Sequence, residues 1–375
     1  MLKVWVGTRE SDILTYNYFD YSITFYGSGK DTNFSYCDTI RERSNYKNSF
    51  TQFVINNIDA LITQYKHIEI HFYNSVFAHK ILELQPNFYD SFKNLNSAYV
   101  LNVLRHKSLS RLWLSNSICV PAFTTLSKDE CRLDNLIRKF GSFNNFVIQK
   151  NFSGGGAGTY LLNAETEKYI HTLLSDNELF LVSPYYENSQ NFSCHMIIGE
   201  KTQLIFPASK QLLDTSANHL SYCGNDHAAV TANEKSMLYD SAKRIAKQIS
   251  KIGYRGICGA DFIINNNKIM LIEINPRFMG SSFAINYALK KANYKSLFEL
   301  NDISFNGESD LLEYQYLENL TIDINNYCVF YNSSTDRANQ LYNELRTTSI
   351  LFEDGWLNAV KYEEHAYLFR YLLPL

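Results

Sequence analysis

Two apolar segments near the middle of the chain constrain the fold most, because they carry acidic residues where a sheet would bury them. The segments are RGICGADFII and KIMLIEIN, and three asparagines at 265–267 separate them. Apolar runs on either side of a short polar turn predict a β-hairpin. Side chains two positions apart in a strand share a face, so Glu273 and Asn275 point the same way. The antiparallel partner strand then brings Asp261 close to Glu273.

The three side chains of this hairpin suit a metal ion. Mg²⁺ takes oxygen ligands and usually completes its shell with water and phosphate oxygens. A purely structural role would bury two acids without an obvious basic partner, which is costly. The sequence therefore predicts a magnesium site formed by Asp261, Glu273 and Asn275. Arg277 continues the same face, and the geometry of its charged guanidinium group matches a phosphate or a substrate carboxylate. The alternative is that Arg277 forms an ion pair with the acids.

A glycine-rich loop joins two further strands, FVIQK at 146–150 and TYLLN at 159–163. A loop between strands that lacks the ending GK[ST] is not a P-loop. Glycines let backbone N–H groups approach phosphate oxygens, although many glycine hairpins only turn the chain. Lys150, at the end of the first strand, could meet phosphates beneath the loop. We interpret the loop as a flap over a nucleotide, with contacts from Ser153, Gly154, Gly155, Gly156 and Gly158.

Four segments together resemble a known family over roughly residues 100–290. In chain order, FVIQK, SGGGAG, LVSPYYEN and RGICGADFI…IMLIEINPR resemble the ATP-grasp superfamily of carboxylate-amine ligases. The resemblance implies the fold class α/β (α+β), with an N-terminal α/β domain followed by two subdomains that clasp ATP between two antiparallel sheets. It also implies ATP and Mg²⁺ as cofactors, with two ions expected and Mn²⁺ as an acceptable substitute.

The resemblance further implies roles for individual residues. Lys107 would reach ATP together with Lys150, with a basic helix face as the alternative interpretation of Lys107. Catalysis would rest on Lys150, Lys210 and Arg277. Ser281 and Ser282 would join Arg277 at the acyl phosphate or substrate. The contacts to adenine and ribose would come from a hinge and the residues after it, namely Ser183, Tyr185, Tyr186, Glu187 and Asn191.

Strand and helix patterns divide the chain into four parts. A helical pattern at 95–116 spans the first boundary, the stretch from 206 to 231 reads as mostly loop, and the tail beyond 300 shows one weak strand and one weak helix. The predicted parts are an N-terminal α/β domain at 1–105, a small ATP-grasp subdomain with the flap at 106–182, a metal and phosphate subdomain at 183–300, and a C-terminal extension at 301–375.

Charge and length limit the classes of partner. The 375 residues contain 35 Lys+Arg and 38 Asp+Glu, for a net charge of -3, and no long basic run, so we expect no nucleic-acid partner. The start lacks a signal-peptide pattern and no apolar stretch reaches about 18 residues, which predicts a cytoplasmic protein without a membrane partner. Seven scattered cysteines without a CxxC pair indicate neither a zinc site nor a redox dithiol.

The resemblance implies an ATP-grasp ligase that joins a carboxylate to an amine through an acyl phosphate and releases ADP and phosphate. Amino acids or small peptides are the expected substrates, and a homodimer is compatible with the sequence. Two alternatives stay open: a ligase that modifies or macrocyclises a ribosomal precursor peptide, and a non-catalytic ATP-binding scaffold.

Overall fold

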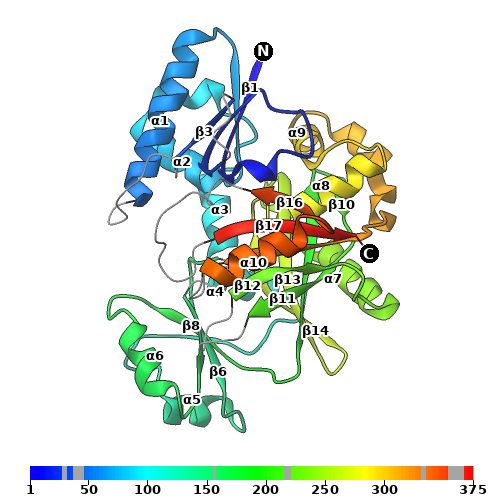
Figure 1. The fold of residues 1–375 in the computed structure, drawn as a ribbon. Coiled ribbons are helices and arrows are strands. Elements are labelled where there is room, and N and C mark those ends of the chain that lie inside the picture. Colours follow the sequence, from blue (N-terminus) through cyan, green and yellow to red (C-terminus); the bar gives the residue numbers. More distant parts are fainter. Residues whose placement is uncertain are drawn as a thin grey trace.

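The computed structural model describes residues 1–27, 32–36, 46–154, 158–214, 221–330, 335–353 and 367–374. These residues form three sheets, of which the first is parallel and the other two are antiparallel (Figure 1). The predicted class, an N-terminal α/β domain followed by two antiparallel sheets, is confirmed. Within the described ranges, none of the helices is both long enough and apolar enough to cross a bilayer.

The N-terminal sheet has the strand order β3-β2-β1-β4 and lies at the top of Figure 1. Its central strands are apolar on both faces, as expected for a parallel sheet that is covered on both sides: Val4 and Ile70 on one face and Trp5 on the other are fully buried or nearly so. Helix α2 begins after Asn74, whose side chain accepts a hydrogen bond from the N–H of Val76. The elements are β1 (Leu2–Arg9), η1 (Glu10–Asp12), β2 (Tyr21–Tyr26), β3 (Asn33–Ser35), α1 (Tyr46–Gln64), β4 (Ile68–Phe72), α2 (Ser75–Leu84) and η2 (Pro86–Ser91).

The small antiparallel sheet, with the order β5-β8-β6-β7, has a core of its own (Figure 1). Phe146, Ile148 and Phe180 are completely buried there. The flap joins β6 to β7, and the N–H of Lys150 donates to the carbonyl of Gly158 at 2.9 Å. The elements are β5 (Thr124–Leu126), α5 (Leu133–Phe140), β6 (Phe146–Lys150), β7 (Thr159–Leu162), α6 (Glu167–Leu173) and β8 (Phe180–Pro184).

The large antiparallel sheet has the order β14-β13-β9-β11-β12-β15-β17-β16, and β10 pairs with β9. The stretch from 206 to 231, interpreted as mostly loop, contains two of these strands, because the polar segments SKQLLD and SYCGND hide the alternation. Strands from the predicted C-terminal extension complete the same sheet. The strands are β9 (Gln190–Ile198), β10 (Gln203–Ile205), β11 (Ser209–Asp214), β12 (Ser221–Asp226), β13 (Gly256–Asn265), β14 (Lys268–Asn275), β15 (Ile324–Phe330), β16 (Ile350–Glu353) and β17 (Tyr367–Pro374).

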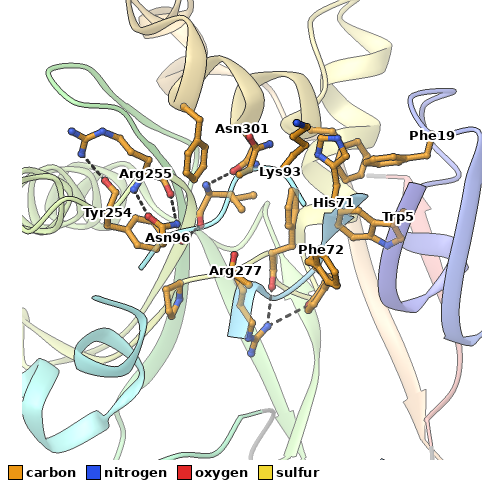
Figure 2. A pocket seen from close by; sticks show the side chains of 18 residues that line it. Trp5, Phe19, His71, Phe72, Lys93, Asn96, Tyr254, Arg255, Arg277 and Asn301 are labelled. Carbon is orange, nitrogen blue, oxygen red and sulfur yellow. Dashed lines mark hydrogen bonds between the residues drawn. The ribbon is translucent and has the colours of Figure 1, made fainter. Parts of the chain in front are cut away.

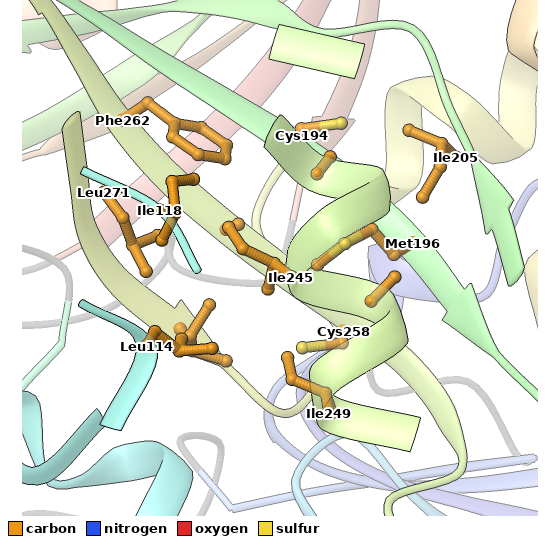
Figure 3. Packing of buried hydrophobic residues seen from close by; sticks show 14 of the residues in the cluster. Leu114, Ile118, Cys194, Met196, Ile205, Ile245, Ile249, Cys258, Phe262 and Leu271 are labelled. Carbon is orange, nitrogen blue, oxygen red and sulfur yellow. The ribbon is translucent and has the colours of Figure 1, made fainter. Parts of the chain in front are cut away.

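Helix α7 covers one face of the large sheet. Figure 3 shows Ile245 and Ile249 packing with Met196 and Cys258 of the strands, and burial of each such side chain contributes about 1.5–3 kcal/mol. The helix begins with a capping box, in which Thr231 and Glu234 satisfy each other's backbone N–H groups. The remaining helices are α3 (Ala98–Arg105), α4 (Lys107–Leu114), α7 (Ala232–Lys251), α8 (Ser282–Lys291), α9 (Leu297–Asn306), η4 (Glu308–Asn319) and α10 (Thr335–Leu345).

The single helix predicted at 95–116 is wrong: the structure has two helices that meet at His106. The backbone of His106 is extended, with ψ 103°, so it ends α3. Its side chain then caps α4 by accepting a hydrogen bond from the N–H of Leu109. The break makes Lys107 the first residue of α4 and directs this helix towards the flap, where the N–H of Lys107 donates to the carbonyl of Asn151.

Specific contacts fix the N-terminal domain against the large sheet. Figure 2 shows Trp5 and His71 of the N-terminal sheet at this junction, together with Asn96 and Arg255. The Asn96 side chain donates to the Arg255 carbonyl and accepts from the Arg255 N–H, both at 2.7 Å. On the other side, Arg370 of β17 donates to Asp12 at 2.8 Å in a buried ion pair. Residues at the end of β1 and β4 are therefore held beside the large sheet.

Candidate nucleotide and metal site

The predicted hairpin is present as β13 and β14, and its turn explains the register. Asn266 and Asn267 have φ values of 48° and 59°, the pair of left-handed conformations that a two-residue type I′ turn requires. The turn pairs Asn265 with Lys268, and a β-bulge between Asp261 and Phe262 then shifts the register by one residue. The shifted register sets Asp261 opposite Glu273 and Gly259 opposite Asn275. Asp261, Glu273 and Asn275 all line one cavity of about 260 Å³, which we call the acidic cavity.

Lys107 places a buried positive charge beside the acids of this cavity. Its Nζ lies 3.1 Å from Oε2 of Glu273, and only 3% of its side chain is exposed, against 17% for Glu273. The same ammonium group donates to the carbonyl of Ser153 at 2.7 Å and to its hydroxyl at 3.0 Å. Lys107 thus connects Glu273 of β14 to the first residues of the flap, and it is not part of a solvated helix face.

The two acids differ in their electrostatic surroundings. Burial, followed by the charge of Glu273, raises the pKa of Asp261. Burial acts in the same direction on Glu273, but the ammonium of Lys107, the charge of Arg277 and the hydrogen bond from Asn275 together outweigh it and lower the pKa of Glu273. The amide of Asn275 donates to both carboxylates, at 2.9 Å and 3.3 Å. Lys107 compensates one charge of the pair, so a divalent cation would favour the ionised form of both acids.

These residues fit the predicted magnesium ion. Among the described residues, no three His, Cys, Asp or Glu side chains gather at one point, so the set consists of two carboxylates and one amide. Mg²⁺ is commonly held by one or two carboxylates together with substrate phosphates and water. Gln211 adds a contact that the sequence did not suggest, since its Nε2 donates to Oδ1 of Asp261 at 2.9 Å.

The flap residues are only partly brought to the acidic cavity. Ser153 and Gly154 line it, whereas Gly155 and Gly156 lie outside the described residues. Gly158 has φ +69°, and a Cβ there would lie 2.9 Å from the side chain of Lys150.

Lys150, predicted beneath the flap, does not line the acidic cavity. Its Nζ is paired with Glu178 at 2.9 Å, and a third of its side chain is exposed. Gln149 lines the cavity in its place, because neighbouring residues of a strand face opposite sides. Arg111 fixes Gln149 by donating to its side-chain oxygen at 2.9 Å.

Arg277 lines the acidic cavity as predicted and keeps its charge available. It donates to Oδ1 of Asn275 at 3.2 Å, to the hydroxyl of Tyr73 at 3.3 Å and to the carbonyl of Phe278 at 2.9 Å. Within the described ranges it forms no ion pair with an acidic side chain. The alternative interpretation of Arg277 as a salt-bridge partner of the acids is therefore not supported.

The other predicted substrate and phosphate residues divide into two groups. Ser281 lines the acidic cavity, but Ser282 accepts a hydrogen bond from the N–H of Met279 and lies 3.0 Å from Nε2 of His195, which indicates a structural role. Lys210 does not line the cavity either. Its neighbour Gln211 does, again because of the strand alternation.

The hinge lies between the two antiparallel sheets, after β8. The N–H of Tyr185 donates to the carbonyl of Asn145 at 2.8 Å, and Glu187 accepts a hydrogen bond from the side chain of the same asparagine. Tyr186 accepts from the N–H of Ala122 through its hydroxyl. Of the predicted adenine and ribose residues, Asn191 lines the acidic cavity, and Ser183, Tyr185, Tyr186 and Glu187 do not.

Several lining residues were missed from the sequence. They come from strands whose place in the sheets depends on distant pairing, and strand alternation is the signal that could have suggested some of them. The missed polar residues are Arg9, Tyr73, Gln149, Thr159, Ser193, Gln211 and Tyr222.

Residues 105–281 match the family model described as an ATP-grasp domain, and this segment contains the flap, the hinge and the acidic hairpin. The chain contains an ATP-grasp domain. Two curated relatives match part of the chain. The arginine-specific carbamoyl phosphate synthase large chain of Geobacillus stearothermophilus is 24% identical over 136 residues, which are 35% of this chain and 12% of that protein. The [butirosin acyl-carrier protein]-L-glutamate ligase of Niallia circulans is 22% identical over 203 residues.

The match to the N. circulans ligase covers 50% of the chain and 48% of that protein, so the chain spans half or less of the length of both curated relatives.

Solved structures share the whole fold. N5-carboxyaminoimidazole synthetase from Staphylococcus aureus, complexed with ADP, has a TM-score of 0.64 at 13% identity, covering 100% of this chain and 93% of that one. L-amino acid ligase from Bacillus licheniformis has a TM-score of 0.61 at 10% identity, with coverage of 100% and 93%.

Proposed function

We propose that the chain is an ATP-dependent ligase that forms an amide bond between a carboxylate and an amine. The observation that carries this proposal is the acidic cavity inside the ATP-grasp domain, where Asp261, Glu273 and Asn275 lie beside Lys107 and Arg277. Acids for a metal and cations for a phosphate in one cavity are the parts that phosphoryl transfer requires. The names of the N. circulans and B. licheniformis proteins, an L-glutamate ligase and an L-amino acid ligase, agree with amino acid or peptide substrates.

In the proposed reaction, a carboxylate oxygen of the substrate attacks the γ-phosphorus of ATP, and the bond to the β,γ-bridging oxygen breaks to release ADP. The amine then attacks the carbonyl carbon of the acyl phosphate, which expels phosphate and loses a proton. Asp261, Glu273 and Asn275 would hold Mg²⁺, which would neutralise charge on the phosphates; two ions, and replacement by Mn²⁺, belong to the same proposal.

Each cation of the acidic cavity has a distinct task in this reaction. Lys107, already in contact with the flap at Ser153, would leave Glu273 for the phosphates when the metal takes over the compensation of that carboxylate. Arg277 would hold the substrate carboxylate or the transferred phosphoryl group, because its guanidinium has no acidic partner in the described part of the chain. Positioning and electrostatic stabilisation would supply most of the rate.

The test measures the products of ATP turnover with pools of carboxylates and amines. We expect ADP and phosphate, and a hydroxamate when hydroxylamine replaces the amine. Glu273→Gln serves as the negative control, since it removes a metal-ligand charge while preserving shape. AMP and pyrophosphate would contradict the acyl-phosphate route, and ATP binding without turnover on any pool would favour the scaffold alternative.

A further inference from the structure

A second cavity opens beside the acidic cavity, between the N-terminal domain and the end of β14. It has a volume of about 710 Å³, and it shares Ser153, Glu273, Asn275 and Arg277 with the acidic cavity. Most of its other walls come from the end of β1 and from helices α1 and α2, and Phe25, Arg105 and Phe152 contribute as well. We call it the aromatic chamber. Its volume lies within the range of small-molecule sites, roughly 300–1,000 Å³, and it exceeds what one small amino acid fills.

Aromatic side chains form one part of this chamber. The rings of Phe50 and Phe77 stack at 5.5 Å with an interplanar angle of 6°, and Phe25 meets Phe50 edge-on at 5.3 Å. Tyr73 and Phe152 line the chamber as well, and 53% of Phe152 is exposed. Partly exposed rings gathered round a cavity provide apolar faces that a flat ligand can cover.

Three cations form the other part of the chamber: Lys80, Arg105 and Arg277. None of them forms an ion pair with an acidic side chain in the described ranges. Lys80 donates to the neutral side chain of Asn48 at 3.5 Å, and the Arg105 guanidinium lies 5.5 Å from the ring of Phe152.

Among the residues that the structure describes, one acid lines the chamber, and it does not compensate these charges. It is Glu273, which is paired with Lys107. The positive charges also affect one another, since burial and then the charge of Arg277 lower the pKa of Arg105. A chamber with this excess of positive charge favours an anionic ligand.

We infer that the aromatic chamber binds the carboxylate substrate, and that this substrate carries an aromatic ring and a second anionic group. The inference rests on the proposed ligase function, which it makes specific. Arg277 lines both cavities, so a carboxylate held there lies where the phosphates of the nucleotide and the body of the substrate meet. Lys80 lies three residues after Phe77 on α2, so the two side chains share a helix face. The ring contacts Phe77 while the second anion meets Lys80.

Binding of three matched peptides tests the inference without turnover. N-acetyl-aspartyl-phenylalanine has a ring and two carboxylates, N-acetyl-asparaginyl-phenylalanine lacks one carboxylate, and N-acetyl-aspartyl-alanine lacks the ring. Each is titrated calorimetrically into the full chain with Mg²⁺ and a non-hydrolysable ATP analogue. We expect the first peptide to bind at least tenfold more tightly than either of the others. Affinities of the three peptides within twofold of one another, or no measurable binding of the first, would overturn the inference.

Variants assign the preference to the chamber. Lys80→Met should remove the discrimination between the aspartyl and asparaginyl peptides and leave the preference for the ring unchanged. Lys247→Met, an exposed lysine on the outer face of α7, is the matched control and should retain both preferences. Discrimination by charge that survives Lys80→Met would overturn the assignment. Because the nucleotide analogue is not hydrolysed, these preferences can hold even where the assay of ligase products fails, so the two failures are distinguishable.

Discussion

The ion pair between Lys107 and Glu273 gives a prediction that can be worked from the structure. Lys107→Met would leave the carboxylate of Glu273 largely buried without its cation, which lies at 3.1 Å in the native chain. Breaking a buried pair from one side costs about 3–5 kcal/mol. We expect about 3 kcal/mol, the lower end of that range, because Glu273 in the variant can take up a proton.

Compensation of charge between Lys107 and Glu273 also decides how stable the double variant is and how the losses depend on pH. Glu273→Gln alone leaves the Lys107 ammonium buried, but the pair Lys107→Met with Glu273→Gln has no uncompensated charge, so the losses should not add. We expect a coupling energy of about 2 kcal/mol. Without Lys107, the pKa of Glu273 rises above its value in the unfolded chain. The destabilisation by Lys107→Met should therefore grow as the pH is raised above the ordinary glutamate pKa of about 4.3, and it should level off above the folded-state pKa of Glu273.

Thermal unfolding in the presence of EDTA measures these effects without a contribution from bound metal. A loss of 3 kcal/mol corresponds to a fall in Tm of roughly 6–12 °C for a domain of 150–250 residues. The double variant should melt at a higher temperature than Lys107→Met. Additive losses in the cycle, or a Lys107→Met effect that is equal at pH 4.5 and pH 8, would refute the view that the pair compensates a buried charge.

Three further predictions concern the flap, strand β11 and acid pH. Gly158→Ala, at φ +69° and 2.9 Å from a lysine side chain, should raise the KM for ATP, whereas Gly253→Ala, at φ +86° with nothing within 4 Å, should carry the same backbone strain and leave the KM unchanged. Gln211→Leu should raise the Mg²⁺ concentration that gives half-maximal turnover about tenfold or more, by analogy with other residues that hold metal ligands in place. An equal rise in Lys210→Met would show that the neighbouring lysine does act at the nucleotide. Burial lowers the pKa of His71 to about 4, despite a nearby carboxylate, so its contribution to stability is present above pH 6.5 and falls by about 1.4 kcal/mol at pH 5.5. Chemical unfolding measures how far the free energy of unfolding falls between a pH above 6.5 and pH 5.5. This fall should be smaller in His71→Gln than in the native chain by about 1.4 kcal/mol, and an equal fall in both proteins would contradict the assignment.

The acidic hairpin could be predicted because all the information for it is local. Two apolar strands and an asparagine turn fix the register next to the loop, and the period of two places Glu273 and Asn275 on one face. The β-bulge between Asp261 and Phe262, which sets Asp261 opposite Glu273, was not predicted. Lys150 and Lys210 do not line the acidic cavity, and their contacts to ATP stay predictions. Each lies one position from the residue that lines the acidic cavity, and a change of one position along a strand moves a side chain to the opposite face. The resemblance to the ATP-grasp superfamily indicated where each strand lies in the sequence. Which face of the sheet each side chain occupies depends on how the strand pairs with distant strands.

The residues from outside the ATP-grasp domain could not be predicted, because their positions depend on contacts between segments far apart in the sequence. Arg9 and Tyr73 reach the acidic cavity from the N-terminal sheet. That sheet is held in place in part by Arg370, which belongs to β17 and pairs with Asp12, 358 residues earlier. No local sequence pattern predicts such a contact.

This long-range construction also separates two properties of the site. The two acids of the acidic cavity lie on β13 and β14, which the hairpin turn and α7 hold in place. The aromatic chamber takes most of its own walls from β1, α1 and α2. Substitutions at Phe50, Phe77 or Lys80 can therefore change which acid is bound without moving the acids of the hairpin. Arg277 is the exception, because it lines both cavities, and its replacement should impair substrate binding and phosphoryl transfer together.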